Sequence, residues 1–271
     1  MKNNTLFIGL FLLILNGCAN YKQSKDININ TQTQVPIKEH TVLAVLWQQN
    51  AAEYRALCHQ AFNIARYRLN EIVANNKSVK PLAIITDIDE TILDNSPYSS
   101  HLILNDQNFN KESWITWGKK ESAHLVPGAA EFINHAANLG VEIFYVSNRY
   151  DVQLNETINN LNRFQLANAD KDHVLLRSET SGKEDRRQKI KDLYEVVLLL
   201  GDNLSDFDDV YDEQNSEQRN QHVKNMKDSF GSKFIVFPNP MYGDWETKGV
   251  YEGKSISEKN KNELRIKKLK Q

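Results

Sequence analysis

Four aspartates in two short motifs are the residues of this sequence best suited to metal and phosphate chemistry. Asp87 and Asp89 are separated by one residue, and Asp202 and Asp206 belong to a Gly-Asp-x-x-x-Asp pattern. If the fold brings these carboxylates together, they repel one another and require a cation or raised pKa values. Oxygen donors without a grouping of Cys or His favour Mg²⁺ over Zn²⁺. The two motifs therefore predict a site for a hard divalent cation.

A single aspartate is more often a helix cap or a turn former than a metal ligand. Here, however, each motif directly follows an apolar run, and so does a third polar cluster, Ser147-Asn148-Arg149. At the end of its run, the Ser147 hydroxyl is placed to donate a hydrogen bond to a phosphoryl oxygen. The alternative for Ser147 is a helix-capping serine. The shared placement of the clusters favours one common site over separate capping roles.

The elements that must position these side chains are short apolar runs, which we predict to be strands. They cover residues 82–86, 141–146, 173–176, 196–200 and 234–237, and the helical patterns between them cover 129–139, 152–164 and 183–194. Strands that alternate with helices indicate an α/β fold with a parallel sheet and helices on both faces. Ligands bind beyond the carboxyl ends of such strands. All of the polar clusters should therefore meet at one edge of an open sheet of about five strands.

One globular domain is predicted for residues 41–271. Its N-terminal helical part, residues 41–80, contains a long amphipathic helix with at most one break. Residues 95–126 interrupt the alternation of strands and helices, and we predict that they form a small, mainly helical cap lobe. The tail beyond Asp244 is polar and rich in lysine, which indicates a solvated helix and loop at the periphery.

The first residues have the pattern of a bacterial export signal. Lys2 precedes the apolar run Leu6–Leu15, which is too short to span a bilayer, because a spanning helix needs ~20 residues. The segment Asn16-Gly17-Cys18 follows and resembles a lipobox, at which the signal is cut and the new terminal cysteine is acylated. We therefore predict a signal peptide over residues 1–17 and lipidation of Cys18. In the alternative, Cys18 is incidental and the segment is a plain signal peptide.

Residues 18–40 are rich in polar side chains, and we predict that they form a lipidated, flexible tether. Ala19 follows the acylated cysteine, where an aspartate would favour retention in the inner membrane, so the expected location is the outer membrane. The formal net charge of −2 excludes a large basic surface for a nucleic-acid polymer. Two cysteines exclude a disulfide scaffold, and Cys58 is expected to be a buried, small apolar residue.

Two stretches of the chain resemble the signatures of one enzyme family. The stretch from Asp87 to Tyr98 is similar to the first signature of the class C acid phosphatases, and the stretch from Val197 to Phe207 is similar to the second. These are the DDDD phosphohydrolases of the haloacid dehalogenase superfamily, and the strongest resemblance is to their bacterial lipoprotein 5′-nucleotidases. The resemblance extends from the lipobox to about Trp245 and implies the Rossmann-like sheet of that superfamily. One departure is Thr86, where the first signature usually has an aliphatic residue.

The resemblance implies a role for each aspartate in a two-step phosphoryl transfer through an aspartyl-phosphate. Asp87 would be the nucleophile and a ligand of Mg²⁺, with one ion per site. Asp89 would be the general acid and then the general base, and its main-chain carbonyl would also bind the metal. Asp202 would be the second carboxylate ligand. Asp206 would accept hydrogen bonds from metal-bound water or from a lysine.

The resemblance also implies a lysine that binds the phosphate, and we predict that this residue is Lys183. It precedes a helix and lies before the fourth strand, where the superfamily places this lysine, and Arg186 is a candidate for an assisting cation. Lys189 and Lys191 remain alternatives. For the rest of the substrate, Asn148 is a candidate binding residue. Aromatic side chains that would stack on a nucleobase, with core packing as the alternative, are Phe109, Trp114 and Tyr242.

The favoured hypothesis is an exported, Mg²⁺-dependent acid phosphatase that hydrolyses nucleoside 5′-monophosphates, nicotinamide mononucleotide among them. The first alternative is a broad phosphomonoesterase without a preference for nucleotides. A phospho-acceptor receiver module lacks an acid two residues after its nucleophile and carries no lipobox. A non-catalytic lipoprotein has little support, because every catalytic position is filled. The expected partners are a small phosphomonoester and, through the lipid, a membrane, and the sequence leaves open whether the protein forms a homodimer.

Overall fold

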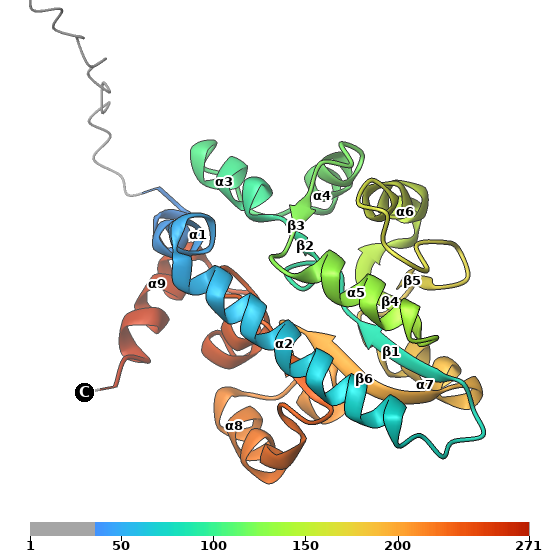
Figure 1. Cartoon of the computed structure of the whole chain (residues 1–271). Coiled ribbons are helices and arrows are strands. Elements are labelled where there is room, and N and C mark those ends of the chain that lie inside the picture. Colours follow the sequence, from blue (N-terminus) through green and yellow to red (C-terminus); the bar gives the residue numbers. More distant parts are fainter. Residues whose placement is uncertain (1–35, 271) are drawn as a thin grey trace, which may run out of the picture. The chain divides into compact units, whose positions relative to one another are not determined.

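A parallel sheet with the strand order β5-β4-β1-β6-β7 forms the centre of the computed structural model, which describes residues 36–270 (Figure 1). The strands are β1 (Leu82–Thr86), β4 (Glu142–Tyr150), β5 (Val174–Arg177), β6 (Glu195–Gly201) and β7 (Phe234–Val236). The predicted fold class is confirmed. One predicted boundary is wrong, since β4 continues beyond residue 146 and contains Ser147, Asn148 and Arg149. The predicted signal peptide, residues 1–17, and the predicted lipidation site, Cys18, lie outside the described residues.

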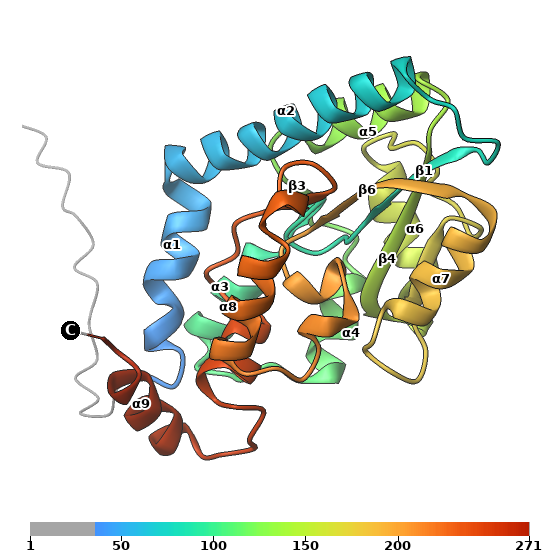
Figure 2. The ribbon, with the colours of Figure 1, turned by 90° about the horizontal axis from the view of Figure 1, so that it is seen from below.

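Helices cover both faces of the sheet, as the alternation predicts (Figure 2). Side chains that alternate along β1 enter different cores, with Ile84 in one core and Ile85 in the other. The core of Ile84 is covered by α2 (Ala52–Ala74), α5 (Ala129–Asn138) and α6 (Leu154–Asn162). The core of Ile85 is covered by α7 (Glu184–Leu193) and by aromatic residues near α8 (Ser216–Asn225). The sequence did not predict α8, because this helix is mostly polar and shows no apolar stripe.

The long N-terminal helix has the single break that its periodicity allowed. Ala51 has an extended backbone with ψ near 130°, and it separates α1 (Val42–Asn50) from α2. The axis of α1 therefore turns away from that of α2 (Figure 2). This turn brings α1 against α3 (Ser96–Leu104) of the inserted lobe, where Gln49 donates hydrogen bonds to Ser96 and Ser100. Cys58 of α2 is fully buried in the core, as expected.

The inserted lobe consists mainly of α3 and α4 (Lys111–Gly118). A two-stranded antiparallel pair closes its base and was not predicted, because each strand, β2 (Leu93–Asp94) and β3 (His124–Leu125), has only two residues. The lobe has its own small core around Tyr98, Leu102 and Trp114. The ring centres of Tyr98 and Trp114 lie 5.1 Å apart in an edge-to-face arrangement. The lobe is thus a packed unit above the end of the sheet.

The first described residues contact both the tail and the inserted lobe. His40 lies 3.6 Å from the carboxylate of Glu246 in the tail, and the main-chain nitrogen of Ile37 donates a hydrogen bond to Asp106 of the lobe. The predicted boundary of the tether at residue 40 is therefore too late, since residues 36–40 contact the domain. The tail contains a π-helix, η6 (Trp245–Val250), and α9 (Glu258–Lys267). The predicted peripheral helix is α9, which buries none of its residues, whereas Tyr251 before it is buried.

Short 3₁₀ turns join several of these elements. They are η1 (Glu39–Thr41), η2 (Asp151–Gln153), η3 (Leu204–Asp206), η4 (Asp209–Tyr211) and η5 (Lys227–Ser229). Over residues 36–270, no helix combines the length and the apolar character that a membrane crossing requires.

Candidate active site

A cavity of about 940 Å³ opens at the carboxyl ends of the strands, between the sheet, the inserted lobe and the tail. The four predicted aspartates, Asp87, Asp89, Asp202 and Asp206, all line it together with Lys183. The predicted meeting of the polar clusters at one edge of the sheet therefore holds for these residues. It follows from the topology, because the carboxyl ends of neighbouring parallel strands lie side by side.

The backbone holds Asp87 between the two central strands. The main-chain nitrogen of Asp87 donates a hydrogen bond of 2.9 Å to the carbonyl of Leu200 in β6. Thr86, the residue that departs from the family signature, is fully buried, and its hydroxyl donates a 2.8 Å hydrogen bond to the carbonyl of Asp87. The polar side chain is thus satisfied within the strand end and leaves the carboxylate of Asp87 facing the cavity.

Gly201 lets Asp206 approach the end of β6. A Cβ atom at this position would overlap the Asp206 side chain, so any other residue would have to displace it. Asp206 ends the 3₁₀ turn η3, and one of its oxygens accepts a 2.9 Å hydrogen bond from the main-chain nitrogen of Asn203. The glycine and the tight turn together bring the second aspartate motif back toward Asp87.

Lys183 lies between two of the aspartates. Its Nζ atom is 2.5 Å from Oδ1 of Asp87 and 2.6 Å from Oδ1 of Asp206, and the residue is only 5% exposed. Although burial acts against it, the charges of Asp206 and Asp87 raise the pKa of Lys183, so the ammonium is retained. Of the alternatives, Lys191 pairs with Glu184, and Lys189 is exposed. The structure therefore places Lys183 beside the predicted nucleophile.

The carboxylates of Asp87, Asp202 and Asp206 form a close group, with oxygen atoms within 4.8 Å of one another. Burial raises the pKa of Asp87 to about 7, and burial followed by the charge of Asp206 raises the pKa of Asp202 well above its ordinary value. Lys183 neutralises only part of this charge. Oxygen donors with uncompensated negative charge fit a hard divalent cation. Asn239 orients Asp202 by a 2.8 Å hydrogen bond to Oδ2.

Asp89 belongs to a separate polar network at the side of this group. Arg149 donates to its Oδ1 atom from Nη2 at 2.8 Å and from Nε at 2.9 Å, and Asn95 donates to the same oxygen at 2.8 Å. The Ser147 hydroxyl lies 3.2 Å from Oδ2 of Asp89. In this arrangement Ser147 therefore donates to Asp89, and its donation to a phosphoryl oxygen stays a prediction.

Arg149 and Asn95 are the site residues that sequence reasoning missed. Arg149 is 2% exposed, and its guanidinium also lies 5.8 Å from the centre of the Trp114 ring. The signal that was available is a charged residue three positions after the buried run 141–146, where burial requires a partner. Asn95 gave no such signal, because an asparagine between a strand and a helix usually caps the helix.

Asn148 and Arg186 lie beside this network. The side chain of Asn148 is exposed, and its Oδ1 atom accepts a 2.8 Å hydrogen bond from Arg186. Arg186 also donates to the carbonyl of Ser147 at 2.6 Å. The predicted assisting cation therefore holds the end of β4 through its main chain. Only Asn148 of this pair is among the residues that line the cavity.

The three predicted aromatic residues all line the cavity, but they differ in exposure. Phe109 is 55% exposed and Tyr242 is 38% exposed, whereas Trp114 is 9% exposed and packs in the core of the lobe. The hydroxyl of Tyr242 donates a 3.1 Å hydrogen bond to Glu90, a fully buried carboxyl whose pKa is raised to about 8 by burial. Phe109 and Tyr242 can therefore offer ring surface to a ligand, and Trp114 mainly supports the lobe.

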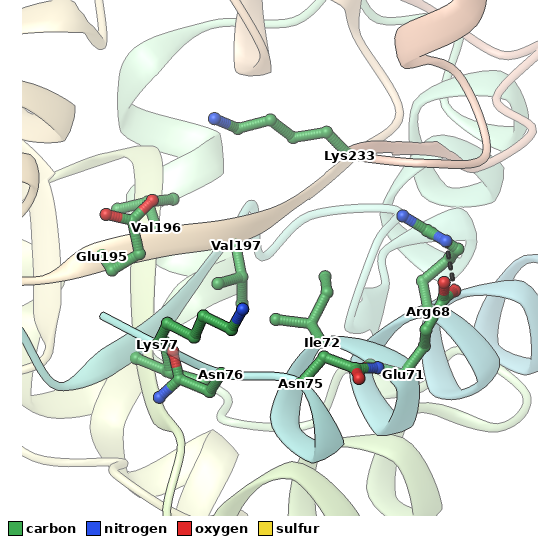
Figure 3. Close-up of a pocket in the computed structure, with 11 residues that line it drawn as sticks. Arg68, Glu71, Ile72, Asn75, Asn76, Lys77, Glu195, Val196, Val197 and Lys233 are labelled. Atoms are coloured by element: carbon green, nitrogen blue, oxygen red, sulfur yellow. Dashed lines mark hydrogen bonds and ion pairs between the residues drawn. The ribbon is translucent and has the colours of Figure 1, made fainter.

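A second hollow, of about 510 Å³, lies near the opposite ends of β1 and β6 (Figure 3). In it Arg68 pairs with Glu71, while Lys77 and Lys233 extend from loops on either side of Val197 (Figure 3). It contains none of the four predicted aspartates. We therefore assign the candidate active site to the first cavity.

Comparison with known proteins agrees with this geometry. A family model described as the HAD superfamily, subfamily IIIB (acid phosphatase), matches residues 12–245. The structure of the class C acid phosphatase from Bacillus anthracis is 39% identical, covers 88% of this chain and 99% of its own, and superimposes with a TM-score of 0.84. The same type of enzyme from Bacillus anthracis with tungstate bound is 38% identical, with the same coverage and TM-score. The stem 31 kDa glycoprotein of Glycine max is 25% identical over 236 residues, which cover 83% of this chain and 82% of that protein.

Proposed function

This chain belongs to the acid phosphatases of HAD subfamily IIIB and is a phosphomonoester hydrolase, and we propose that it is an exported, Mg²⁺-dependent 5′-nucleotidase. The observation that carries the proposal is the contact of Lys183 with both Asp87 and Asp206, next to Asp202 and inside a cavity lined by aromatic rings. A lysine and a nucleophilic carboxylate at the floor of the cavity suit a phosphate, and the rings suit a planar base. Tungstate is a tetrahedral oxyanion like phosphate, so its binding to the similar enzyme from Bacillus anthracis supports an oxyanion site here.

In the first step, an oxygen of Asp87 attacks phosphorus and the bond from phosphorus to the ester oxygen breaks. Oδ1 of Asp87 is held by Lys183, so the other oxygen is the one available for attack. Asp89 donates a proton to the departing alcohol oxygen. The products of this step are the alcohol and an acyl phosphate on Asp87.

In the second step, water attacks the acyl phosphate and Asp89 takes a proton from that water. The bond between Asp87 and phosphorus breaks, and phosphate and the free carboxylate of Asp87 are regenerated. Lys183 offers positive charge and N–H donors to the phosphoryl oxygens throughout. Asp206 keeps the Lys183 ammonium in place by their 2.6 Å contact.

Asp87 and Asp202, with the main-chain carbonyl of Asp89, would hold the Mg²⁺ ion, which would supply the charge that lets an anionic carboxylate meet an anionic phosphate. Three carboxylates with oxygen atoms within 4.8 Å, two of them buried and Asp202 half-buried, and a single ammonium group support this assignment. The preference for Mg²⁺ over Zn²⁺ rests on the purely oxygen donor set.

The proposed preference for nucleotides rests on Phe109 and Tyr242, which reach the cavity from the inserted lobe and from the loop after β7. Stacking on an aromatic ring contributes ~1–3 kcal/mol per base and tolerates any base. The enzyme should therefore accept many 5′-nucleotides, nicotinamide mononucleotide among them. The competing candidate, a broad phosphomonoesterase, requires that these rings contribute nothing to substrate binding.

One experiment tests both the metal and the substrate. Phosphate release is measured with AMP, nicotinamide mononucleotide and glycerol phosphate, after chelation and after return of Mg²⁺ or Zn²⁺, between about pH 4 and pH 8. We expect no activity after chelation, recovery with Mg²⁺, and a kcat/KM that is ~5–150-fold higher for AMP than for glycerol phosphate. Activity that resists chelation would refute the metal site. Equal kcat/KM values would favour the broad phosphomonoesterase.

We also propose that the enzyme is anchored to the outer membrane through acylated Cys18. The support is the lipobox-like segment that ends at Cys18, with Ala19 after it. Metabolic labelling with a fatty acid should mark the wild type and leave Cys18→Ala unlabelled, with the wild type in the membrane fraction. An unlabelled wild type would leave residues 1–17 as a plain signal peptide.

A further inference from the structure

One side of the cavity carries a cation that no part of the mechanism uses. Tyr150 ends β4 and Arg177 ends β5, the two residues are register partners in the sheet, and both line the cavity. The guanidinium carbon of Arg177 lies 5.2 Å from the centre of the Tyr150 ring. Nζ of Lys111, from α4 of the inserted lobe, lies 4.5 Å from the same ring. Tyr150 thus contacts two cations, of which Arg177 lines the cavity and Lys111 does not.

Neither cation is neutralised by the protein. Among residues 36–270, neither Arg177 nor Lys111 forms an ion pair, whereas Arg149 pairs with Asp89 and Arg187 with Glu184. The Nε atom of Arg177 is also buried without a hydrogen-bond acceptor in this part of the chain. A buried N–H donor that lacks an acceptor is costly. Arg66 has a buried Nε in the same state, but only Arg177 of these two lines the cavity, where a ligand can supply the acceptor.

The position of Arg177 relative to the nucleophile gives the size of that ligand. Asp87 follows β1, and β5 is separated from β1 by β4 alone, so the two strands stand roughly 10 Å apart. Arg177 also lies two residues beyond Leu175, the register partner of Val146, which moves it a further ~7 Å along the strand direction. A molecule whose cleaved phosphate lies at Asp87 can reach Arg177 with a second group on the same sugar. The planar fork of a guanidinium matches the paired oxygens of a phosphate.

We propose that Arg177, with Lys111 as the second cation on the Tyr150 ring, forms a second phosphate subsite that binds a phosphate group which is not cleaved. The favoured substrates are then phosphomonoesters that carry two phosphates, such as nucleoside 3′,5′-bisphosphates, with the 5′ group at Asp87 and the 3′ group at Arg177. This inference rests on the proposed function for the orientation of the nucleotide. The positive subsite itself depends only on Arg177 and Tyr150 at the ends of β5 and β4 and on Lys111 of α4.

The test compares kcat/KM for adenosine 3′,5′-bisphosphate with kcat/KM for AMP, and identifies adenosine 3′-monophosphate as the product by chromatography. The wild type should favour the bisphosphate. In Arg177→Met the ratio of the two kcat/KM values should fall by roughly tenfold or more, because hydrogen bonds between charged groups are lost. Arg177→Lys, which keeps the charge without the fork, should give an intermediate ratio. Lys111→Met removes an exposed side chain and should lower the ratio by roughly twofold to threefold.

The matched control is Arg163→Met. Arg163 also lies over an aromatic ring, 5.5 Å from the centre of Phe164, but it is not among the residues that line the cavity. This variant should leave the ratio unchanged. A wild type that does not favour the bisphosphate, or a ratio that Arg177→Met and Lys111→Met leave at the wild-type value, would overturn the subsite.

A second substrate pair separates this proposal from the preference for nucleotides. Fructose 1,6-bisphosphate and fructose 6-phosphate repeat the comparison without a nucleobase. If AMP is no better than glycerol phosphate but Arg177→Met still lowers the ratio for the fructose pair, the nucleotide proposal fails and the subsite stands. If AMP is preferred and neither ratio responds to Arg177, the subsite fails and the nucleotide proposal stands.

Discussion

The guanidinium of Arg149 donates two hydrogen bonds to Oδ1 of Asp89 at the edge of the active site, from Nη2 at 2.8 Å and from Nε at 2.9 Å. Sixty residues separate the two in sequence, and Arg149 is almost completely buried. Arg149 forms no hydrogen bond or ion pair with Asp87, Asp202 or Asp206 among the described residues. Its position makes it a residue that orients the proposed acid and base.

We predict that Arg149→Met lowers kcat by about 10²-fold with a smaller effect on KM, because a misplaced proton donor loses most of its effect on the transition state. A double-variant cycle separates this role from general damage. If Arg149 acts through Asp89, then Arg149→Met combined with Asp89→Asn should be about as slow as Asp89→Asn alone. Losses that multiply would show that Arg149 has an independent role.

We predict that the metal-free protein loses stability as the pH rises. Burial raises the pKa of Asp87 to about 7, above its value in the unfolded chain, so its contribution to stability is complete below the unfolded pKa and is lost as the pH passes about 7. With chelator present, the free energy of unfolding in urea should be about 1–4 kcal/mol lower at pH 8 than at pH 5, since one pKa unit corresponds to ~1.4 kcal/mol. Asp87→Asn should reduce this dependence without abolishing it, because burial also raises the pKa of Glu90 to about 8 and the pKa of Asp202 above its ordinary value.

Added Mg²⁺ provides the companion measurement. A cation that binds the ionised carboxylates of the folded state should restore much of the stability lost at pH 8. If the metal-free protein became more stable between pH 5 and pH 8, the pKa values of Asp87 and Asp202 could not both be raised by burial.

We predict that Gly201→Ala distorts the active site by displacing Asp206. The new Cβ would overlap Asp206, which must move and take Lys183 with it. We expect a loss of about 1–3 kcal/mol in the free energy of unfolding, the range seen for overpacked sites, and a fall in kcat of about tenfold or more. Gly182→Ala is the control, because its Cβ would lie 3.9 Å from its nearest neighbour, Oδ2 of Asp212, which is an ordinary contact distance. Equal effects of the two variants would contradict this account.

We predict that the ring of Tyr242, not its hydroxyl, sets the preference for nucleotides. Tyr242→Phe removes only the hydrogen bond to Glu90 and should keep the ratio of kcat/KM for AMP to that for glycerol phosphate. Tyr242→Ala removes the ring and should lower this ratio by ~5–150-fold. If Tyr242→Ala reduces kcat/KM for both substrates by the same factor, Tyr242 serves the structure of the pocket instead of the substrate.

The sequence by itself determined the sheet and the place of the four aspartates. Continuous apolar runs such as residues 82–86 and 196–200 are local signals of strands buried on both faces. Once such strands are parallel, the residues that follow them must lie at one edge. Asp87 and Asp202 could therefore be placed together without any knowledge of side-chain contacts, and the glycine before Asp202 fits the close approach of Asp206.

Only the tertiary structure decided which polar groups pair and what closes the cavity. Arg149 meets Asp89 through an extension of β4 past residue 146, and a charged strand end carries no signal of its partner. The polar segments at 36–40 and beyond Asp244 bury little apolar surface. Their sequences therefore show no apolar periodicity from which their contacts with the domain could be predicted. The physical reason is the same in both cases, because periodicity records the burial of apolar side chains, whereas polar pairing depends on distances between residues far apart in the chain.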